Sequence, residues 1–489
     1  MLLDLLDGAL QERRDAYALD GAAYEQLHAG AARVAYGLHA RGVRRGDRVA
    51  IYCENRHAFV YAYLAALRLG AIAVPANVLY RANDLATVLL DARPRAVVHS
   101  AAVAEFVAAA GMDRAGTIDA ADVEAWARDS SAPSLDFSIR PQPDDVALII
   151  FTSGTTGRAK GAMLTHRNLA AVAVQLMGAW RWRPSDTLLL TLPLFHVHGL
   201  LAGLTTSLCA GGRVLLRERF DAHDVLETLA RGDVTMFFGV PTMYVRLLEA
   251  AGDSRVPPMR LYVSGSAALS AEIHCAFERR FGASILERYG ATEFGFVLGN
   301  RYAGPRVAGS VGVPLPGARV RVAAPDDARP ISPGEVGELL VGGPSVFAGY
   351  WERPEATQAA FVADPSGERW YRSGDLARYD SEHDVYRIVG RIKEMIVTGG
   401  FNVYPREVED AIEGLAGVRA CAVVAKRDAA RGEIPVAFVE GDERLDAGAI
   451  VAALRELLAS FKIPKEIRFV ESLPRNAMGK VDKPALRGY

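Results

Sequence analysis

Short apolar runs alternate with amphipathic stretches along most of the chain. The runs have the length and near-continuous apolar character of buried strands, and they lie at residues 48–53, 95–100, 145–151, 186–194, 212–217, 234–240, 260–266 and 285–290. Between many of them, as at residues 58–70 and 271–282, apolar side chains repeat with helical period. Buried strands separated by helices are typical of a mostly parallel sheet covered on both faces, so we predict an α/β fold.

The pattern changes near residue 300. Glycine- and proline-rich strand candidates at residues 310–322 and 334–343 predict a smaller antiparallel or barrel-like portion. After residues 385–391, a helix that opens at Pro405 is followed by two strands and a second helix, which predicts a compact α+β unit. We therefore divide the chain into an N-terminal domain (1–390), a connection (391–393) and a C-terminal domain (394–489).

Charge and cysteine content exclude several classes of protein. The 489 residues carry 56 Lys and Arg against 58 Asp and Glu, a net charge of −2, which argues against a general nucleic-acid-binding protein. The four cysteines are scattered without a CxxC pair, so we expect neither disulfides nor a zinc site. Asp4 and Asp7 interrupt the first apolar run, and Arg68 interrupts the most apolar window. We therefore expect no signal peptide, no membrane span and a cytoplasmic location.

Lysine is rare and unevenly placed. The chain has seven lysines against 49 arginines, and Lys160 is the only lysine before residue 393. It ends a stretch rich in glycine and hydroxyl groups that directly follows an apolar run: Thr152, Ser153, Gly154, Thr155, Thr156, Gly157 and Lys160. Glycines let the backbone approach a ligand, while N–H groups, hydroxyls and an ammonium bind phosphate oxygens. The stretch predicts a phosphate-binding loop, although it lacks the Lys-Ser/Thr pair of a Walker A motif.

This stretch resembles the phosphate loop of the adenylate-forming family of acyl-CoA synthetases, adenylation domains and luciferases. Ala159 departs from the family pattern, which has proline before the lysine. Four further motifs follow in the family's order: YGATE (289–293), SGDLA (373–377), GRIKEMIVTGGFNVYPREVE (390–409) and PRNAMGK (474–480). Together they extend the resemblance over nearly the whole chain. The segments PLFHVHGL (193–200), FGVPTMYVR (238–246), VSGSAAL (263–269) and ERYG (287–290) look closest to malonyl-CoA synthetases.

The resemblance implies ATP, Mg²⁺ and coenzyme A as ligands. It assigns Mg²⁺ to Thr156 and Glu293, and the ribose to Asp375, assisted by Arg391. It also counts Thr292, Glu293 and His196 among the catalytic residues. It also implies nucleotide contacts from the segments that contain Ser264, Gly265, Ser266, Glu287, Arg288, Tyr289 and Gly290. A carboxylate beside a phosphate loop suits Mg²⁺, which prefers oxygen ligands.

Lys480 matches the catalytic lysine of the family. The resemblance implies that its ammonium offsets charge while a carboxylate attacks the α-phosphorus of ATP. A mobile C-terminal domain then rotates about Lys393 and presents Gly399, Gly400 and Phe401 to the thiol of CoA, although a plain turn would also explain the two glycines. We expect Lys462, Lys465 and Lys483 to be ordinary solvated lysines.

The acid is the least determined feature. By resemblance to malonyl-CoA synthetases, His196, Gly265 and Phe294 line the acyl pocket and Arg246 pairs with a second carboxylate, although it could equally face solvent. Malonate or methylmalonate is thus the first candidate for the small carboxylic acid substrate. Phe294 and Phe296 depart from the malonate pattern and favour an aryl or short branched acid.

Three other functions stay open at this point. An adenylation enzyme of the same kind could load a carrier protein instead of free CoA, because both present a pantetheine thiol. A luciferase-like oxygenase could use the same fold. A non-catalytic relative is disfavoured, because Lys160, Glu293, Asp375 and Lys480 are all present.

Overall fold

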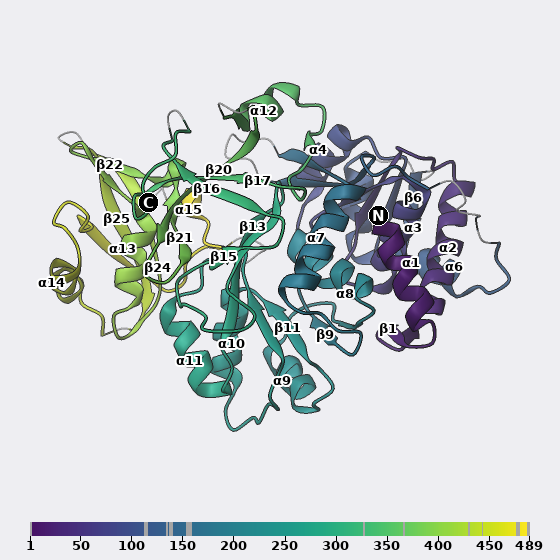
Figure 1. The fold of residues 1–489 in the computed structure, drawn as a ribbon, viewed down its shortest axis with the longest axis horizontal. Coiled ribbons are helices and arrows are strands. Elements are labelled where there is room, and N and C mark those ends of the chain that lie inside the picture. The colour runs from purple at the N-terminus through teal and green to yellow at the C-terminus, as the bar shows by residue number, and fades with distance from the viewer. Residues whose placement is uncertain are drawn as a thin grey trace.

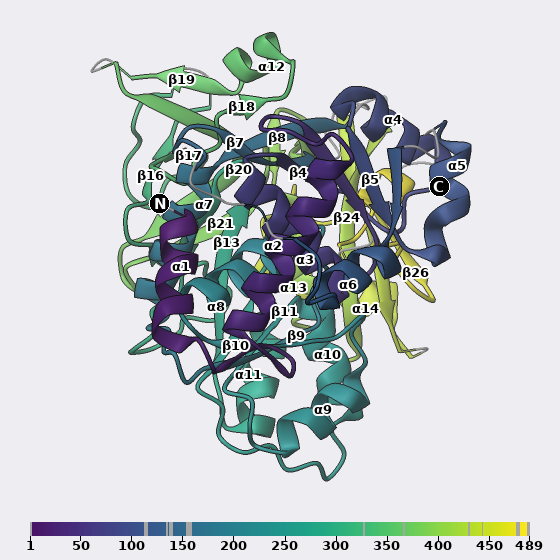
Figure 2. The same cartoon turned by 90° about the vertical axis from the view of Figure 1, so that its right-hand side faces the viewer.

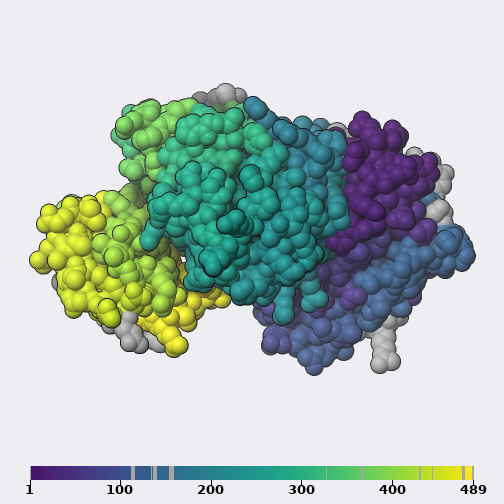
Figure 3. Space-filling view, turned by 90° about the horizontal axis from the view of Figure 1, so that it is seen from below, coloured from purple at the N-terminus to yellow at the C-terminus, as the bar shows by residue number. Residues whose placement is uncertain are grey.

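Two mainly parallel sheets form the larger part of the molecule. The computed structural model describes residues 2–111, 116–133, 135, 140–152, 159–325, 328–364, 367–428, 431–442, 444–475 and 480–486. The predicted α/β fold class is confirmed, with a large N-terminal part and a separate small C-terminal part. The C-terminal residues form a lobe of their own at one end of the molecule (Figures 1 and 3).

The larger sheet has nine strands. Its order is β15 (Val313–Pro314), β14 (Gly295–Gly299), β13 (Ile285–Ala291), β12 (Leu261–Ser264), β11 (Met236–Gly239), β9 (Thr187–Leu190), β10 (Arg213–Leu216), β1 (Tyr17–Leu19) and β2 (Ala22–Ala23). The strands from β13 to β1 are parallel, and β14, β15 and β2 are antiparallel additions at the two ends.

The second sheet has seven strands, five of them parallel. Its order is β18 (Gly349–Tyr350), β8 (Lys160–Thr165), β7 (Val146–Thr152), β4 (Ile72–Pro75), β3 (Arg48–Tyr52), β5 (Ala96–His99) and β6 (Thr117–Asp119). β7 and β8 are an antiparallel pair that pairs Thr152 with Lys160, so the two ends of the predicted phosphate loop are neighbours.

The alternation of side chains along the strands divides the core into layers. In β9, Leu188 and Leu190 belong to the central cluster while Leu189 faces the opposite side, and Phe237 and Phe238 in β11 divide in the same way. The central cluster therefore fills the space between the two sheets, and the helices there are buried on several sides (Figure 2). Nearly all of α3 is buried for this reason.

The helices fall into the layers that these clusters define. The central cluster includes residues of α1 (Leu2–Arg13), α2 (Tyr24–Ala40), α3 (His57–Leu69), α6 (Ala120–Arg128), α7 (His166–Ala179), the π-helix (His198–Thr205) and α8 (Thr206–Cys209). The outer face of the seven-stranded sheet is covered by α4 (Ala82–Ala92), a short 3₁₀ turn (Ala101–Val103) and α5 (Ala104–Ala109). The outer face of the nine-stranded sheet is covered by α9 (Ala222–Ala230), α10 (Pro241–Ala250) and α11 (Ala271–Phe281).

The smaller portion predicted after residue 300 is an antiparallel sheet. It consists of β16 (Arg319–Ala323), β17 (Gly337–Gly342), β20 (Arg369–Asp380) and β19 (Phe361–Ala363), with β21 (Val385–Arg391) also paired to β20 and α12 (Pro354–Ala359) beside it. β20 and β21 pair Asp375 with Arg391, which places two predicted site residues side by side.

The C-terminal lobe is the α+β unit expected from the sequence. A 3₁₀ turn (Ile392–Glu394) leads into a sheet of β23 (Phe401–Val403), β22 (Ile396–Thr398), β25 (Gly432–Gly441) and β24 (Val418–Asp428), with β26 (Glu466–Val470) paired to β25. Its helices are α13 (Pro405–Glu413), α14 (Ala447–Leu457) and α15 (Lys483–Leu486). In the described part of the chain, no helix has the length and apolar character needed to span a bilayer.

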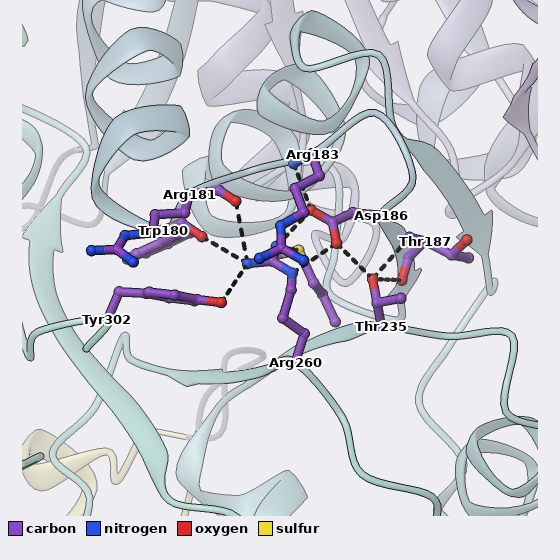
Figure 4. A network of polar contacts seen from close by, with 9 residues as sticks. Trp180, Arg181, Arg183, Asp186, Thr187, Thr235, Arg260 and Tyr302 are labelled. Atoms are coloured by element: carbon purple, nitrogen blue, oxygen red, sulfur yellow. Dashed lines mark hydrogen bonds and ion pairs between the residues drawn. The ribbon is translucent and has the colours of Figure 1, made fainter. Parts of the chain in front are cut away.

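A buried ion pair fixes the amino ends of three central strands (Figure 4). Arg260, just before β12, donates to both carboxylate oxygens of Asp186, just before β9, at 2.7 and 2.6 Å. The Asp186 side chain is 2% exposed, and Thr235, just before β11, donates to it at 3.0 Å. Arg260 also donates to the carbonyl of Trp180 and to the hydroxyl of Tyr302.

Replacing Arg260 should destabilise the fold strongly. Arg260→Met would leave the Asp186 carboxylate buried without its cation, which costs about 3–5 kcal/mol in unfolding free energy. Chemical denaturation of the purified protein measures this as a lower midpoint. Arg231→Met is the matched control, because Arg231 and Glu227 form an exposed pair one helical turn apart, and such pairs contribute about 0.5 kcal/mol or less. Equal shifts in the two variants would contradict the prediction.

Candidate functional site

The site lies where the carboxyl ends of several strands converge. The loops after β9, β12 and β13 follow parallel strands of one sheet, so they open at the same edge. This edge carries His196 and His198, then Ser264 to Ser266, then residues 291–293. It is the edge opposite the Asp186–Arg260 ion pair, which lies at the amino ends of the same strands.

One group of residues surrounds a buried guanidinium. Arg288 is 3% exposed and donates to the hydroxyl of Ser266 at 3.2 Å, and the Ser266 hydroxyl lies 3.3 Å from Nδ1 of His198. The guanidinium lies 4.5 Å from the ring centre of Phe296. Its Nε has no hydrogen-bond partner, and no carboxylate of the described residues forms an ion pair with it.

Gly265 makes this arrangement possible. A Cβ added to Gly265 would lie 2.5 Å from Nε of Arg288, so any side chain there would displace the guanidinium. Ser266 follows with a φ of 70°, a left-handed conformation that is costly for a residue with a side chain. The strained turn directs the Ser266 hydroxyl toward Arg288 and His198.

Both histidines are held neutral. Burial, and after it the charges of Lys480 and Arg288, lowers the pKa of His196 to about 3. Burial and Arg288 also lower the pKa of His198 well below its usual value. The backbone N–H of His198 donates to Nδ1 of His196 at 3.3 Å, and Nε2 of His198 has no partner. A neutral imidazole beside a buried cation can accept or donate a hydrogen bond without adding charge.

The segment His198–Thr205 is a π-helix. A Cβ on Gly199 would lie 2.3 Å from the carbonyl oxygen of Pro193, so the chain folds back tightly on itself here. The hydroxyls of Thr205 and Thr206 donate to the carbonyls of Leu200 and Leu201, five residues earlier. Such wide turns are frequent at functional sites, and this one begins at His198.

A second group flanks the predicted phosphate loop. Glu293 accepts from the hydroxyls of Thr152, at 3.4 Å, and Tyr350, at 3.2 Å. The Lys160 ammonium lies 5.3 Å from the ring centre of Tyr350. Thr292, next to Glu293, is buried. The expected loop residues Ser153, Gly154, Thr155, Thr156 and Gly157 lie outside the described residues.

The chemistry of Glu293 fits a divalent cation. Burial raises the pKa of its carboxyl, and no cationic side chain of the described residues forms an ion pair with it. A partly buried carboxylate whose described donors are neutral hydroxyls retains oxygen lone pairs for Mg²⁺. Glu293 could therefore hold Mg²⁺, whereas Thr156, the other expected ligand, is among the residues not described.

A third group surrounds Asp375, which is 7% exposed. The hydroxyl of Tyr289 donates to one carboxylate oxygen at 2.5 Å, and Nε of Arg391 lies 3.0 Å from the other. The Asp375 carboxylate raises the pKa of Arg391. Gly290, next to Tyr289, allows a tight hairpin, because a Cβ there would lie 2.0 Å from the carbonyl oxygen of Gly295.

Lys480 connects the three groups. Burial and, after it, the neighbouring charge of Arg391 lower the pKa of the Lys480 ammonium to about 8. Asp375, Arg288 and Glu293 also act on it electrostatically. The C-terminal lobe therefore brings its lysine close to charged groups of the N-terminal part.

Two residues expected in the acyl pocket lie elsewhere. Arg246 is exposed, with its guanidinium 5.0 Å from the ring centre of Phe220, because α10 buries Pro241, Tyr244 and Leu247 instead. Arg246 is thus not part of the buried group, and Arg288 is the cation found there. Phe294 packs against Tyr289 and Tyr371. It is Phe296 that lies near His198.

The other expected site residues are Glu287, Ser264, the turn Gly399–Phe401 and Lys393, and none of them belongs to the three groups described above. Glu287 points away from Arg288, since neighbouring residues of a strand face opposite sides, and it accepts from the N–H of Leu269. The Ser264 hydroxyl is buried without a hydrogen-bond partner.

Gly399, Gly400 and Phe401 form an exposed turn in which Phe401 stacks on Phe461, so they do not reach the group around Lys480 in this arrangement. Lys393 is exposed in the turn between the two parts.

Tyr350 and Lys483 are the residues that the sequence reasoning missed. Tyr350 lies in a short strand beside β8 and contacts both Glu293 and Lys160. A Gly-Tyr-Trp run at residues 349–351 was the available signal. Lys483, expected to be solvated, is buried in two ion pairs.

Comparison with known proteins shows which family the chain resembles over most of its length. The family model described as AMP-binding enzyme matches residues 7–351, and that of the AMP-binding enzyme C-terminal domain matches residues 407–480. A feruloyl-CoA synthase from Amycolatopsis sp is 37% identical, over 95% of this chain and 93% of its own. The mitochondrial malonate–CoA ligase ACSF3 of Mus musculus is 34% identical, over 91% and 83%. The crystal structure of ATP-bound MatB from Rhodopseudomonas palustris superposes with a TM-score of 0.91 at 37% identity, over 100% and 99%.

Proposed function

Because the chain belongs to the AMP-binding enzyme family, as an ATP-dependent, AMP-forming acid–CoA ligase, we propose that its acid is a small dicarboxylate such as malonate or methylmalonate. The observation that carries the proposal is Arg288, a buried guanidinium without a carboxylate partner among the described residues. In this proposal, Lys480 stabilises charge in the first half-reaction, and Arg288 binds the second carboxylate of the acid.

The first half-reaction joins the acid to AMP. One carboxylate oxygen of the acid attacks the α-phosphorus of ATP, the bond to the β-phosphate oxygen breaks, and pyrophosphate leaves. The protein contributes alignment and charge stabilisation. Lys480 places an ammonium between the two anions, and Asp375, held by Tyr289, accepts hydrogen bonds from the ribose hydroxyls. Mg²⁺ held by Glu293 would neutralise charge on the phosphates.

The second half-reaction transfers the acyl group to CoA. The thiol sulfur attacks the acyl carbon, the bond to the AMP oxygen breaks, and AMP leaves while the thiol proton passes to solvent. Lys480 occupies the site in the arrangement described here, and the Gly399–Gly400 turn lies on the exposed edge of the lobe. In the proposal, rotation about Lys393 withdraws the lysine and brings that turn to the acyl-adenylate.

A dicarboxylate would resolve the electrostatic problem of Arg288. A buried, unpaired cation is costly, and burial holds the pKa of Arg288 below its usual value. The second carboxylate of the acid can pair with the guanidinium in bidentate geometry, while Ser266 and neutral His198 are close enough to contribute hydrogen bonds. The malonate–CoA ligase among the relatives acts on an acid of this kind.

An aryl acid is the second candidate. Phe238 and Phe296 are fully buried with ring centres 6.3 Å from that of His198, so they offer flat apolar walls. The feruloyl-CoA synthase among the relatives is named for an aryl acid. Such a substrate would leave Arg288 without a counter-ion, which is why we rank it second.

Removing the Lys480 ammonium should separate the two half-reactions. Lys480→Ala is expected to lower acid-dependent pyrophosphate release by at least about 100-fold, because the charge acts in that transition state. Thioester formation from supplied acyl-adenylate and CoA should persist. The same assay with a phosphopantetheinyl carrier protein in place of CoA tests the alternative acceptor. Equal loss of both half-reactions would contradict the assignment.

The first half-reaction should also depend on pH through Lys480. With a pKa of about 8, the ammonium is present below that pH and is lost above it. The kcat/KM for pyrophosphate release, which reports the free enzyme, should therefore fall as pH rises through about 8. Lys480→Arg keeps its charge, so the fall should move to higher pH in that variant. An unchanged profile would show that another group titrates.

Arg288 should determine the preference for diacids. Arg288→Met is expected to lower kcat/KM for malonate by at least about 30-fold, since losing one partner of a buried charge pair costs about 2–5 kcal/mol. Activity with benzoate or butyrate should be unchanged or higher. Arg246→Met is the matched control and should affect neither class of acid, because Arg246 is exposed. Wild-type protein that activates benzoate but no diacid would favour the aryl candidate.

A further inference from the structure

Lys483 is a buried lysine three residues after Lys480. Its Nζ lies 2.7 Å from Oε1 of Glu409 and 3.1 Å from Oε2 of Glu394, and its side chain is 16% exposed. Burial alone would lower the pKa of Lys483, but the carboxylates of Glu409 and Glu394 outweigh it and raise the pKa. Lys483 is thus a charged group that joins two carboxylates inside the C-terminal lobe.

The two carboxylates come from the turn that leads into the lobe and from the first helix of the lobe. Glu394 ends the 3₁₀ turn and directly follows Lys393, where the chain passes from one part to the other. Glu409 lies on the buried face of α13. Its Oε1 also accepts the backbone N–H of Val423 in β24 at 2.8 Å, so this carboxylate is fixed against the sheet. Lys483 therefore ties the last segment of the chain to the turn, the helix and, through Glu409, the sheet.

The remaining contacts hold the ends of the segment. The N–H of Asp482 donates to the carbonyl of Pro474 at 2.7 Å, and Val481 forms a bridge with Arg475. Leu486 packs into a small apolar cluster. The contacts of Val481 and Asp482 join the segment to the chain just before it, whereas Lys483 is the residue that joins it to Glu394 and α13.

We propose that Lys483 is a positioning residue for Lys480: by joining Glu394 and Glu409, it holds residues 480–486 where the Lys480 ammonium reaches the acid and the α-phosphate. This inference rests on the role proposed above for Lys480. Glu394, Glu409 and Lys483 all lie in the C-terminal lobe, so their contacts move with it as it rotates. Their loss should therefore impair the half-reaction that uses Lys480 and spare the other one.

Lys483→Met tests the inference. Since misplacing a catalytic group by about 1 Å costs up to about 100-fold in rate, we expect kcat for acid-dependent pyrophosphate release to fall by between about 10-fold and 100-fold. The KM values for ATP and acid should change little, because the lost interaction acts in the transition state. Thioester formation from supplied acyl-adenylate should stay at the wild-type rate. Lys483→Arg, which keeps the charge, should recover part of the lost kcat.

Two controls separate positioning from folding. Lys462→Met removes a lysine that pairs with Glu407 on the same helix α13, away from residues 480–486, and should leave both half-reactions unchanged. The triple variant Lys483→Met, Glu394→Gln, Glu409→Gln removes the carboxylates that Lys483→Met alone leaves unpaired, of which Glu409 is buried. Its thermal stability should therefore recover toward wild type while pyrophosphate release stays low. Recovery of pyrophosphate release together with stability would overturn the inference.

The outcomes also distinguish this inference from the proposed function. If Lys480→Ala leaves pyrophosphate release intact, the role of Lys480 is wrong. If Lys480→Ala abolishes it and Lys483→Met behaves like Lys462→Met, only the positioning role of Lys483 is wrong.

Discussion

Concentrated positive charge at the junction of the two parts is the constraint on which the rest of the structure depends. The charges of Arg391 and Arg288 both lower the pKa of Lys480, and burial together with neighbouring cations keeps His196 and His198 neutral. Asp375 pairs with Arg391, and Asp375 and Glu293 both act on Lys480, but no carboxylate of the described residues forms an ion pair with Arg288. Cations in a poorly solvated place repel one another unless anions join them. The site is therefore complementary to phosphates and carboxylates, which the two half-reactions supply.

The fold allows this charge because every part is anchored outside the site. The strand that leads to Ser266 is fixed at its amino end by the Asp186–Arg260 pair, on the opposite edge of the sheet, and it pairs along its length with the strand that carries Arg288. The lobe that carries Lys480 has its own buried pairs around Lys483. Strain in the Ser266 turn is tolerated because the flanking strands are buried on both faces.

Much of the fold and of the site could be predicted from the sequence. Apolar runs with strand length predicted β3, β7, β9 and β12 because these strands are buried on both faces and carry little polar alternation. The ordered motifs predicted that Glu293, Asp375, Arg391 and Lys480 would meet, although more than a hundred positions separate some of them. Motif order carries this information, since each motif matches a family whose fold brings them together.

The substrate end of the site could not be predicted as well. Whether Arg246 or Arg288 enters the pocket depends on which side of a helix or strand faces it, and the register of α10 is set by Tyr244 and Leu247. Phe294 was expected in the acyl pocket, but Phe296 is the ring that lies near His198. The cause is similar, because the irregular pairing of β13 with β14 determines which ring faces His198. The burial of Lys483 depends on Glu394 and Glu409, which lie 89 and 74 positions earlier in the chain.

The separation of the apolar clusters bears on how the protein is made. Among the described residues, the two clusters of the C-terminal lobe contain nothing from before residue 396, and the central cluster between the sheets contains nothing from after residue 388. During synthesis the larger core can thus be completed before the last hundred or so residues emerge from the ribosome. The lobe then folds around its own core, so a truncated nascent chain would already be compact but would lack the ammonium that completes the site.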